Sequence, residues 1–246
     1  MIFQQIGNYV LFLSDICRGR VPLSIIIRDV FNECINAGIK ALPLVCCVTM
    51  LISAGICYQC YMLLNNAFIT DSMILLSLKN MVFLEIAPTL SALIFIGQYG
   101  LGITNSLFAM KISGQIDALR VVGLNQYKIY SLPRVIAGTL MLPVVVGLTS
   151  IVALFVGGVI SYVAYGAKLE SILSGYIDYN YNWWYVSVFI TKAFIFGFLV
   201  SSISSFIGFT ANDGDDVIVV SKRTFNVCCM VVLISDIIIT YYSYLP

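Results

Sequence analysis

The sequence predicts an all-α integral membrane protein with five transmembrane helices. Of its 246 residues, 60% are hydrophobic and only 10% are charged, whereas a soluble domain has about 45–50% apolar and about 25% charged residues. Five apolar stretches are long enough to cross the core of a bilayer, which takes about 20 residues. The basic residues alternate in number between the segments that connect these stretches. These observations exclude an ordinary soluble globule and a disordered chain.

The composition also argues against several function classes. Thirteen basic residues against 12 acidic ones give a net charge of +1, so no nucleic-acid surface is expected. Histidine is absent, which removes histidine-based acid–base catalysis and histidine metal sites. Most of the eight cysteines lie in apolar stretches, including the pair Cys57-x-x-Cys60. We interpret them as small hydrophobic side chains and expect neither a metal nor a cofactor.

The first element expected is an amphipathic helix within residues 1–40, which form an interfacial helix and its lead-in. Apolar residues recur there at helical spacing, and three arginines follow them. Because the basic residues follow the apolar stretch, a cleaved signal peptide is not expected. A plain solvated leader is the alternative. The apolar positions are Ile2, Phe3, Ile6, Val10 and Leu13.

The five membrane spans follow in order within a single membrane domain, residues 1–246. The third is longer than one crossing requires, so it must tilt, kink or protrude. A short amphipathic helix, 111–124, connects the second span to the third. The predicted spans are residues 41–64, 86–110, 135–165, 183–209 and 225–244.

The orientation follows from the positive-inside rule. From the N-terminal segment through the successive loops to the C-terminal tail, the basic residues number 4, 1, 4, 1, 2 and 0. This alternation predicts a cytoplasmic N-terminus and a C-terminus on the outside. It also places the 111–124 helix on the cytoplasmic side.

Two charged residues, Lys192 and Asp236, lie near the middle of the fourth and fifth spans. A charge at that depth costs about 2.5–3.5 kcal/mol on insertion scales, so neither side chain should face lipid tails. One interpretation is a polar spot in an interior cavity that contacts an anionic head group. The other is a Lys192–Asp236 ion pair that only ties the two spans together. The two interpretations do not exclude each other.

The second span is rich in small and polar residues. Gly97-x-x-Gly100-x-Gly102 follows no strand, so it is no nucleotide-binding fingerprint. Glycines in a span let another helix approach closely, and this favours helix packing, including a dimer seam, over ligand contact. Gln98 and Asn105 are the polar candidates there for a lipid head group.

The 111–124 helix has an apolar face and a polar face. Ile112, Ile116 and Leu119 share the apolar one. Such a helix can dock into the groove of a partner protein, and the alternative is a connector that rests on the membrane. The polar residues are Lys111, Gln115, Asp117 and Arg120.

Four stretches of the chain resemble the MlaE/YrbE permease family of bacterial ABC transporters that move phospholipids between the inner and outer membranes. Lys192 with Gly197, and Asp236, also occupy positions where the family pattern has such residues. The resembling stretches are Glu85–Leu93, Met110–Leu119, Pro133-Arg134-Val135 and Met141-Leu142-Pro143.

The resemblance implies a homodimeric permease in the bacterial inner membrane that contributes to outer-membrane lipid asymmetry. It implies a cytoplasmic ATPase that supplies the energy, since this chain is expected to have no ATP site of its own. The groove of that ATPase would receive the helix around Ile112–Gly123, through Lys111, Ile112, Gln115, Ile116, Asp117 and Leu119. A periplasmic MCE-domain lipid carrier and a STAS-domain subunit are the other implied partners.

The chain departs from the family pattern at three positions that are commonly charged. They are Gln98, Ser106 and Gly114 here. The segment Asn212–Asp216 is more acidic than the corresponding family loop, and nothing in the sequence explains it. The expected lipid-binding residues are therefore Gln98, Asn105, Lys192 and Asp236, in a cavity whose polar contacts can differ from those of the family.

Two other functions are open at this point. An intramembrane enzyme would need a catalytic pair such as Lys192 with Ser201 or Ser202, although no motif supports one. A membrane scaffold without transport is the other alternative. ATP hydrolysis by the partner that depends on this subunit would distinguish a transporter from both the enzyme and the scaffold.

Overall fold

The computed structural model describes residues 2–17, 23–64, 70–177, 183–212 and 214–243, and every regular element in these ranges is a helix. This confirms the all-α class. Five helical stretches are long and apolar enough to cross a membrane, as predicted. They are Ile26–Met62, Asp71–Ile112, Gln126–Tyr165, Trp183–Thr210 and Val217–Ser243.

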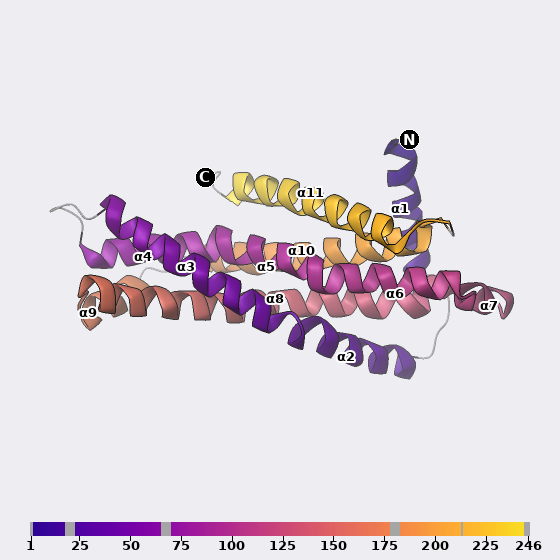
Figure 1. The fold of residues 1–246 in the computed structure, drawn as a ribbon, viewed down its shortest axis with the longest axis horizontal. Helices are drawn as coiled ribbons and strands as arrows, with labels where there is room; N and C mark the ends of the chain where they lie inside the picture. The colour runs from indigo at the N-terminus through magenta and orange to yellow at the C-terminus, as the bar shows by residue number, and fades with distance from the viewer. Residues whose placement is uncertain (1, 18–22, 65–69, 178–182, 213, 244–246) are drawn as a thin grey trace.

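Figure 1 shows the helices packed side by side along the long axis of the molecule. The stretch from Asp71 to Ile112 is one continuous helix that contains two π-helical segments, η1 and η2. The elements are α1 (Ile2–Cys17), α2 (Leu23–Ile39), α3 (Leu42–Leu64), α4 (Asp71–Met81), η1 (Val82–Ile86), α5 (Ala87–Phe95), η2 (Ile96–Gly100), α6 (Leu101–Ile112), α7 (Gln115–Val121), α8 (Gln126–Tyr165), α9 (Leu169–Tyr176), α10 (Trp183–Thr210) and α11 (Val217–Ser243).

The helices are longer than the apolar stretches that predicted them. The second begins at Asp71 rather than Ile86, the third at Gln126 rather than Val135, and the fifth at Val217 rather than Phe225. The prediction counted residues that suit a bilayer core, whereas a helix continues through polar turns at its ends because its backbone bonds are internal. Tyr244, the last residue of the predicted fifth span, lies outside the described residues.

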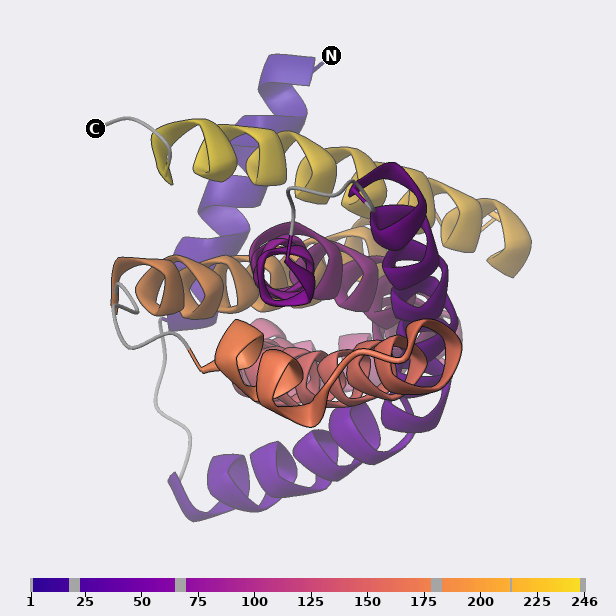
Figure 2. The same cartoon turned by 90° about the vertical axis from the view of Figure 1, so that its left-hand side faces the viewer.

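Two short helices mark opposite ends of the bundle. In Figure 1, α7 lies at one end of the long axis and α9 at the other. α1 runs across the bundle rather than along it, as Figures 1 and 2 both show. Phe12 and Ile16 of α1 are buried, and the Tyr9 hydroxyl lies 2.7 Å from the Ser202 Oγ of α10. Burial raises the pKa of the Tyr9 phenol above its ordinary value, so this group stays neutral.

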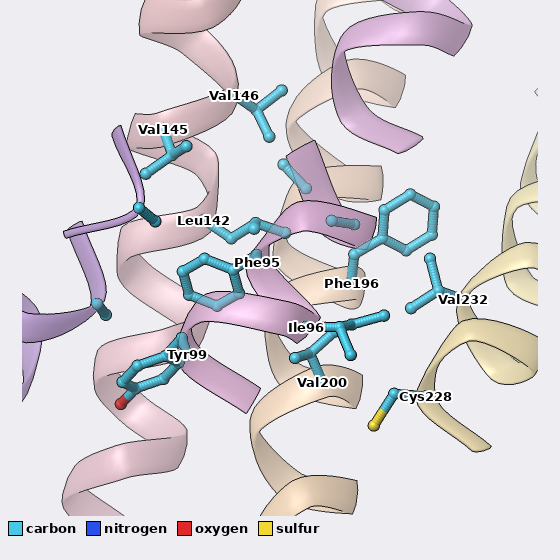
Figure 3. Close-up of a cluster of buried hydrophobic side chains, with 14 of the residues drawn as sticks. Phe95, Ile96, Tyr99, Leu142, Val145, Val146, Phe196, Val200, Cys228 and Val232 are labelled. Carbon is cyan, nitrogen blue, oxygen red and sulfur yellow. The ribbon is translucent and has the colours of Figure 1, made fainter. Parts of the chain in front are cut away.

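The core lies where α5, η2, α8, α10 and α11 meet. In Figure 3 the Phe95 ring lies on the side of Leu142 of α8, whereas the Phe196 ring of α10 lies on the side of Val232 of α11, and Phe95, Leu142 and Phe196 are fully buried. Cys228 of α11 is also fully buried there as a free thiol. This cysteine therefore packs as a small hydrophobic side chain.

Glycines let α8 and α10 approach each other closely. A Cβ added to Gly197 would lie 2.7 Å from the carbonyl oxygen of Gly138, and one added to Gly138 would lie 2.8 Å from the Cβ of Ser201. Neither helix could carry a side chain at these points without moving. The small residues thus fix the spacing of the two helices.

The outer surface of the bundle is apolar. Leu51 of α3, Phe155 of α8 and Ile237 of α11 are each 70% exposed or more. Soluble monomers rarely expose contiguous apolar surface on this scale. The exposed side chains are therefore suited to contact with lipid tails.

Candidate functional site

The amine of Lys192 lies at the centre of a polar cluster between three helices. Its Nζ is 2.8 Å from Oδ1 of Asp236 in α11 and 3.2 Å from Oε2 of Glu85 in η1. It also donates to the Thr240 Oγ1 at 2.7 Å. The Thr240 hydroxyl donates to Glu85, and the Thr89 hydroxyl donates to Asp236 at 3.3 Å. Lys192 itself is only 1% exposed.

Local chain geometry provides one further acceptor for Lys192. In an α-helix the carbonyl of Leu84 would accept from the N–H of residue 88, but Pro88 has no N–H. The Leu84 carbonyl lies in the π-helical segment η1, and Lys192 Nζ donates to it at 3.0 Å. Pro88 and the π-helical turn thus leave the Leu84 carbonyl oxygen free to accept from Lys192.

The Lys192 cluster leaves little free space. The cavity beside it, walled by Glu85, Tyr185, Lys192 and Thr240 among others, has a volume of about 10 Å³, which is about the room for one water molecule. Four close contacts hold the amine, and a lipid head group would have to displace them. This geometry matches the ion-pair interpretation of Lys192 and Asp236.

Glu85 is a member of this cluster that sequence reasoning missed. The predicted second span began at Ile86, so Glu85 was counted outside the membrane. The helix begins at Asp71 instead, and Glu85 lies well inside it. The signal that could have found it was its position one residue before the apolar stretch, because a helix continues beyond the residues that suit a bilayer core.

The other two predicted lipid-binding residues lie elsewhere. The Asn105 Oδ1 accepts a hydrogen bond of 2.7 Å from the Ser221 Oγ and so connects α6 to α11. Gln98 is exposed and lines a separate cavity of about 230 Å³ between α2, η2, α6 and α8. The structure therefore brings Lys192 and Asp236 together but places Gln98 and Asn105 at two other points.

The Gln98 cavity also contains an ion pair that the sequence did not reveal. Nε of Arg134 lies 3.2 Å from Oε1 of Glu33, and the Tyr99 hydroxyl donates to the Arg134 carbonyl at 3.0 Å. Arg134 was assigned to a loop before the third span, and Glu33 to the lead-in of the first. Only the packing of α2 on α8 brings them together.

The predicted 111–124 helix is shorter in the structure, because Lys111 and Ile112 end α6 and α7 covers only Gln115–Val121. Gly114, at a φ of 73°, makes the turn between them. Ile116 is buried, whereas Gln115 and Asp117 are exposed.

The apolar residues of this segment divide between two surroundings. Ile116 and the half-buried Leu119 face the protein, whereas Ile112, Val121 and Val122 are 55%, 89% and 71% exposed. The segment therefore presents an apolar surface with no cover in the described chain.

Lys111 fastens the base of this segment to α10. Its Nζ donates to the carbonyls of Phe209 at 3.1 Å and Ala211 at 2.6 Å, at the end of a helix that stops at Thr210. Carbonyls at a helix C-terminus have no partner within the helix and attract a cation. Lys111 therefore ties the end of α6, just before α7, to the end of α10.

The structure does not assemble the catalytic pair that an enzyme would need. The Ser201 Oγ donates to the Gly197 carbonyl at 2.6 Å, and Ser202 contacts Tyr9 and the Phe198 carbonyl. Both serines are about 14 Å or more along α10 from Lys192, at about 1.5 Å per residue. Lys192 is engaged by carboxylates instead.

Several proteins with similar sequences are described as probable ABC transporter permeases. The model of the permease MlaE family matches residues 30–242. A probable ABC transporter permease protein of Rickettsia felis is 28% identical over 218 residues, which cover 86% of this chain and 81% of that protein. A probable ABC transporter permease protein of Synechocystis is 30% identical over 130 residues, or 53% of this chain and 49% of that protein.

A plant protein is similar over the same length. The chloroplastic protein TRIGALACTOSYLDIACYLGLYCEROL 1 of Arabidopsis thaliana is 30% identical over 130 residues, which cover 53% of this chain and 37% of that protein. The family match covers most of the chain and includes all five long apolar helices. The chain belongs to the MlaE permease family of ABC transporters.

Proposed function

We propose that this permease moves phospholipids between the inner and outer membranes of a bacterial envelope and so maintains the lipid asymmetry of the outer membrane. The match to the MlaE family over residues 30–242 carries the proposal. The plant relative bears the name of a galactolipid built on diacylglycerol, which supports a glycerolipid as cargo. The apolar outer surface suits a protein whose cargo stays in contact with lipid.

The energy comes from a separate ATPase that binds at α7. Gln115 and Asp117 are exposed there, and Ile112 adds apolar contact. Ile116 and Leu119 pack the segment onto the permease, while Lys111 couples it to α10. Binding energy from an exposed apolar patch with charged neighbours is typical of protein interfaces.

The division of roles among the four lipid-binding candidates follows from their contacts. Gln98 faces a cavity large enough for a head group. The other three candidates hold helices together and support the packing around the lipid path; they are Lys192, Asp236 and Asn105. Two copies of the chain would enclose that path, with an MCE-domain carrier outside and a STAS-domain subunit inside as further partners.

The charge distribution orients the chain in the inner membrane. The cytoplasmic side holds the N-terminus and α7, since the basic residues concentrate in these segments. The C-terminus and α9 lie on the periplasmic side. α1, which crosses the bundle, lies in the cytoplasmic interface of the membrane.

Copurification tests this function. The tagged full chain is expressed in its native host and purified in detergent, and the bound proteins and lipids are identified by mass spectrometry. The expected result is an ABC ATPase, together with phospholipid. After reconstitution, ATP should drive fluorescent phospholipid from donor vesicles to acceptor vesicles. Copurification of an ATPase without any ATP-dependent lipid transfer would overturn the lipid cargo, and the absence of an ATPase would favour a scaffold.

Val122→Asp is the sharpest variant for the docking surface, because Val122 is 71% exposed and supports no core. A buried unpaired carboxylate would weaken the contact, so the ATPase should be lost while the permease stays folded. Ser174→Asp, at the opposite end of the molecule in α9, is the matched control and should retain the ATPase. Equal retention by both variants would rule out docking at this end of α7.

A further inference from the structure

The cavity beside Gln98 is built from two polar stripes that face each other. Glu33, Asn36 and Lys40 recur at helical spacing on α2 and just after it, and Gln98, Gly102 and Ser106 recur every fourth residue on η2 and α6. All six line the same cavity of about 230 Å³, with Arg134 of α8. A phosphodiester group with its first waters fits a volume of this size.

Arg134 has an unused donor in this wall. Its side chain is 9% exposed and its Nε is paired with Glu33, but Nη1 is buried without a hydrogen-bond partner among the described residues. A guanidinium carries five N–H donors and no acceptor. A buried donor left unpaired is unfavourable, so an acceptor in the cavity would stabilise this arrangement.

The charges of the wall favour an anion. Lys40 and Arg134 carry two positive charges, and Glu33 carries one negative charge. The net charge of the wall is thus +1, and the amides of Gln98 and Asn36 add neutral donors. Arginine is the side chain best suited to phosphate, because its N–H groups match two oxygens at once.

The surroundings of the cavity favour an amphiphile over a free ion. Ile27, Phe31, Ile35 and Ile39 form the opposite face of α2 and are 43–66% exposed. The cavity lies within three helices long enough to cross a membrane. At about 1.5 Å per residue, Ser106 and Gln98 lie about 9 and 21 Å from the α7 end of their helix, within one leaflet.

We propose that this cavity binds the phosphate group of a phospholipid in the leaflet on the α7 side, with Arg134 as the anchoring cation. The inference rests on the proposed lipid cargo and names the place where that cargo is held. It moves the anchoring charge away from Lys192, which is already compensated by two carboxylates.

The cavity can be closed without altering any charge. A Cβ added to Gly102 would meet nothing within 4 Å, so Gly102→Leu fills the space without straining the helix. Gly147→Leu in α8 is the matched control, since a Cβ there also meets nothing within 4 Å and Gly147 does not line this cavity. Arg134→Gln removes the anchoring charge.

The test uses the purified full-length chain in nanodiscs that contain phosphatidylglycerol with a photoreactive head group, and crosslinked peptides are mapped by mass spectrometry. The parent chain and Gly147→Leu should crosslink in α2 or α6. Gly102→Leu should crosslink less because its side chain occupies the cavity, and Arg134→Gln about tenfold less, the loss expected for one charge-assisted hydrogen bond. A Gly102→Leu chain that crosslinks like the parent would overturn the proposal, even if Arg134→Gln does not fold.

Two further measurements distinguish a lipid phosphate from a free phosphate ion, and the lipid site in this cavity from the proposed lipid transport. Inorganic phosphate at millimolar concentration should leave the crosslink unchanged, and complete competition by phosphate would show an ion site instead of a lipid site. Vesicle transfer is measured on the same variants. If lipid is transferred but no chain crosslinks at the cavity, the lipid site in this cavity is wrong and the proposed lipid cargo stands. If the parent chain crosslinks at the cavity but transfers no lipid, the proposed transport is wrong and the lipid site stands.

Discussion

Nζ of Lys192 lies 2.8 Å from Oδ1 of Asp236, and this contact joins α10 to α11 in the interior of the bundle. Glu85 approaches the same amine from η1. Two consecutive helices, α10 and α11, thus share one charge cluster with η1, which is about 100 residues earlier in the sequence. Removing this cluster should lower the stability of the fold, and any loss of lipid transport should follow from that loss of stability.

Lys192→Met should destabilise the chain strongly. It leaves the largely buried Asp236 and the partly exposed Glu85 without a cation, and breaking a buried ion pair costs about 3–5 kcal/mol. The melting temperature of the purified protein in detergent measures the effect. Adding Asp236→Asn to Lys192→Met should recover part of the loss, since one fewer charge is left unpaired; no recovery would show that the pair does not act as a unit.

Gly197→Ala should also destabilise the chain, through packing alone. The new Cβ would lie 2.7 Å from the Gly138 carbonyl oxygen, and overpacking of this kind costs about 1–3 kcal/mol. Gly147→Ala is the control, because its Cβ meets nothing within 4 Å and alanine is the better helix former by about 1 kcal/mol. Thermal melts should therefore move in opposite directions, and a loss of equal size in both would refute the close crossing.

Lys111→Met should uncouple α7 from α10 without unfolding the bundle. The variant loses the hydrogen bonds to the Phe209 and Ala211 carbonyls at the end of α10. The expected result is a bound ATPase whose hydrolysis no longer drives lipid transfer, measured on vesicles as ATP consumed per lipid moved. Lys222→Met, an exposed residue at the start of α11, should keep the parental ratio.

The orientation can be tested by labelling intact cells with a membrane-impermeant maleimide. A cysteine at Ser174 in α9 should react, because the proposed orientation places that end outside, whereas one at Asp117 in α7 should react only after the cells are opened. Both positions are exposed, so access and not burial decides the result. The parent chain sets the background from its own cysteines. Labelling of Asp117→Cys in intact cells would invert the proposed topology.

The fold class followed from composition and apolar length because a bilayer imposes both. The limits of each helix did not, since hydropathy measures the part of a helix that suits lipid and ignores the rest. Glu85 shows the consequence: one residue before an apolar stretch, it was counted as outside, although its helix had begun at Asp71.

The charge pairs were only partly predictable. Lys192 and Asp236 were recognisable as potential partners because both lie at mid-depth in neighbouring spans. Arg134 and Glu33 were not, since each lies near a polar connection and only the packing of α2 on α8 unites them. The unpaired Nη1 of Arg134 depends on that tertiary contact and has no signature in the sequence.

Both polar clusters adjoin a wide turn of the same long helix: η1 holds Glu85, and η2 holds Gln98. A wide turn of this type accommodates one extra residue and rotates everything beyond it by about 100°, the angle of one residue in an α-helix. Deleting Phe83 or Tyr99 would therefore shorten the chain by one residue and restore regular winding, yet turn Asn105 and Lys111 away from their partners. The two insertions therefore set the rotational orientation of the α6 end of this helix, and with it the direction in which α7 is presented.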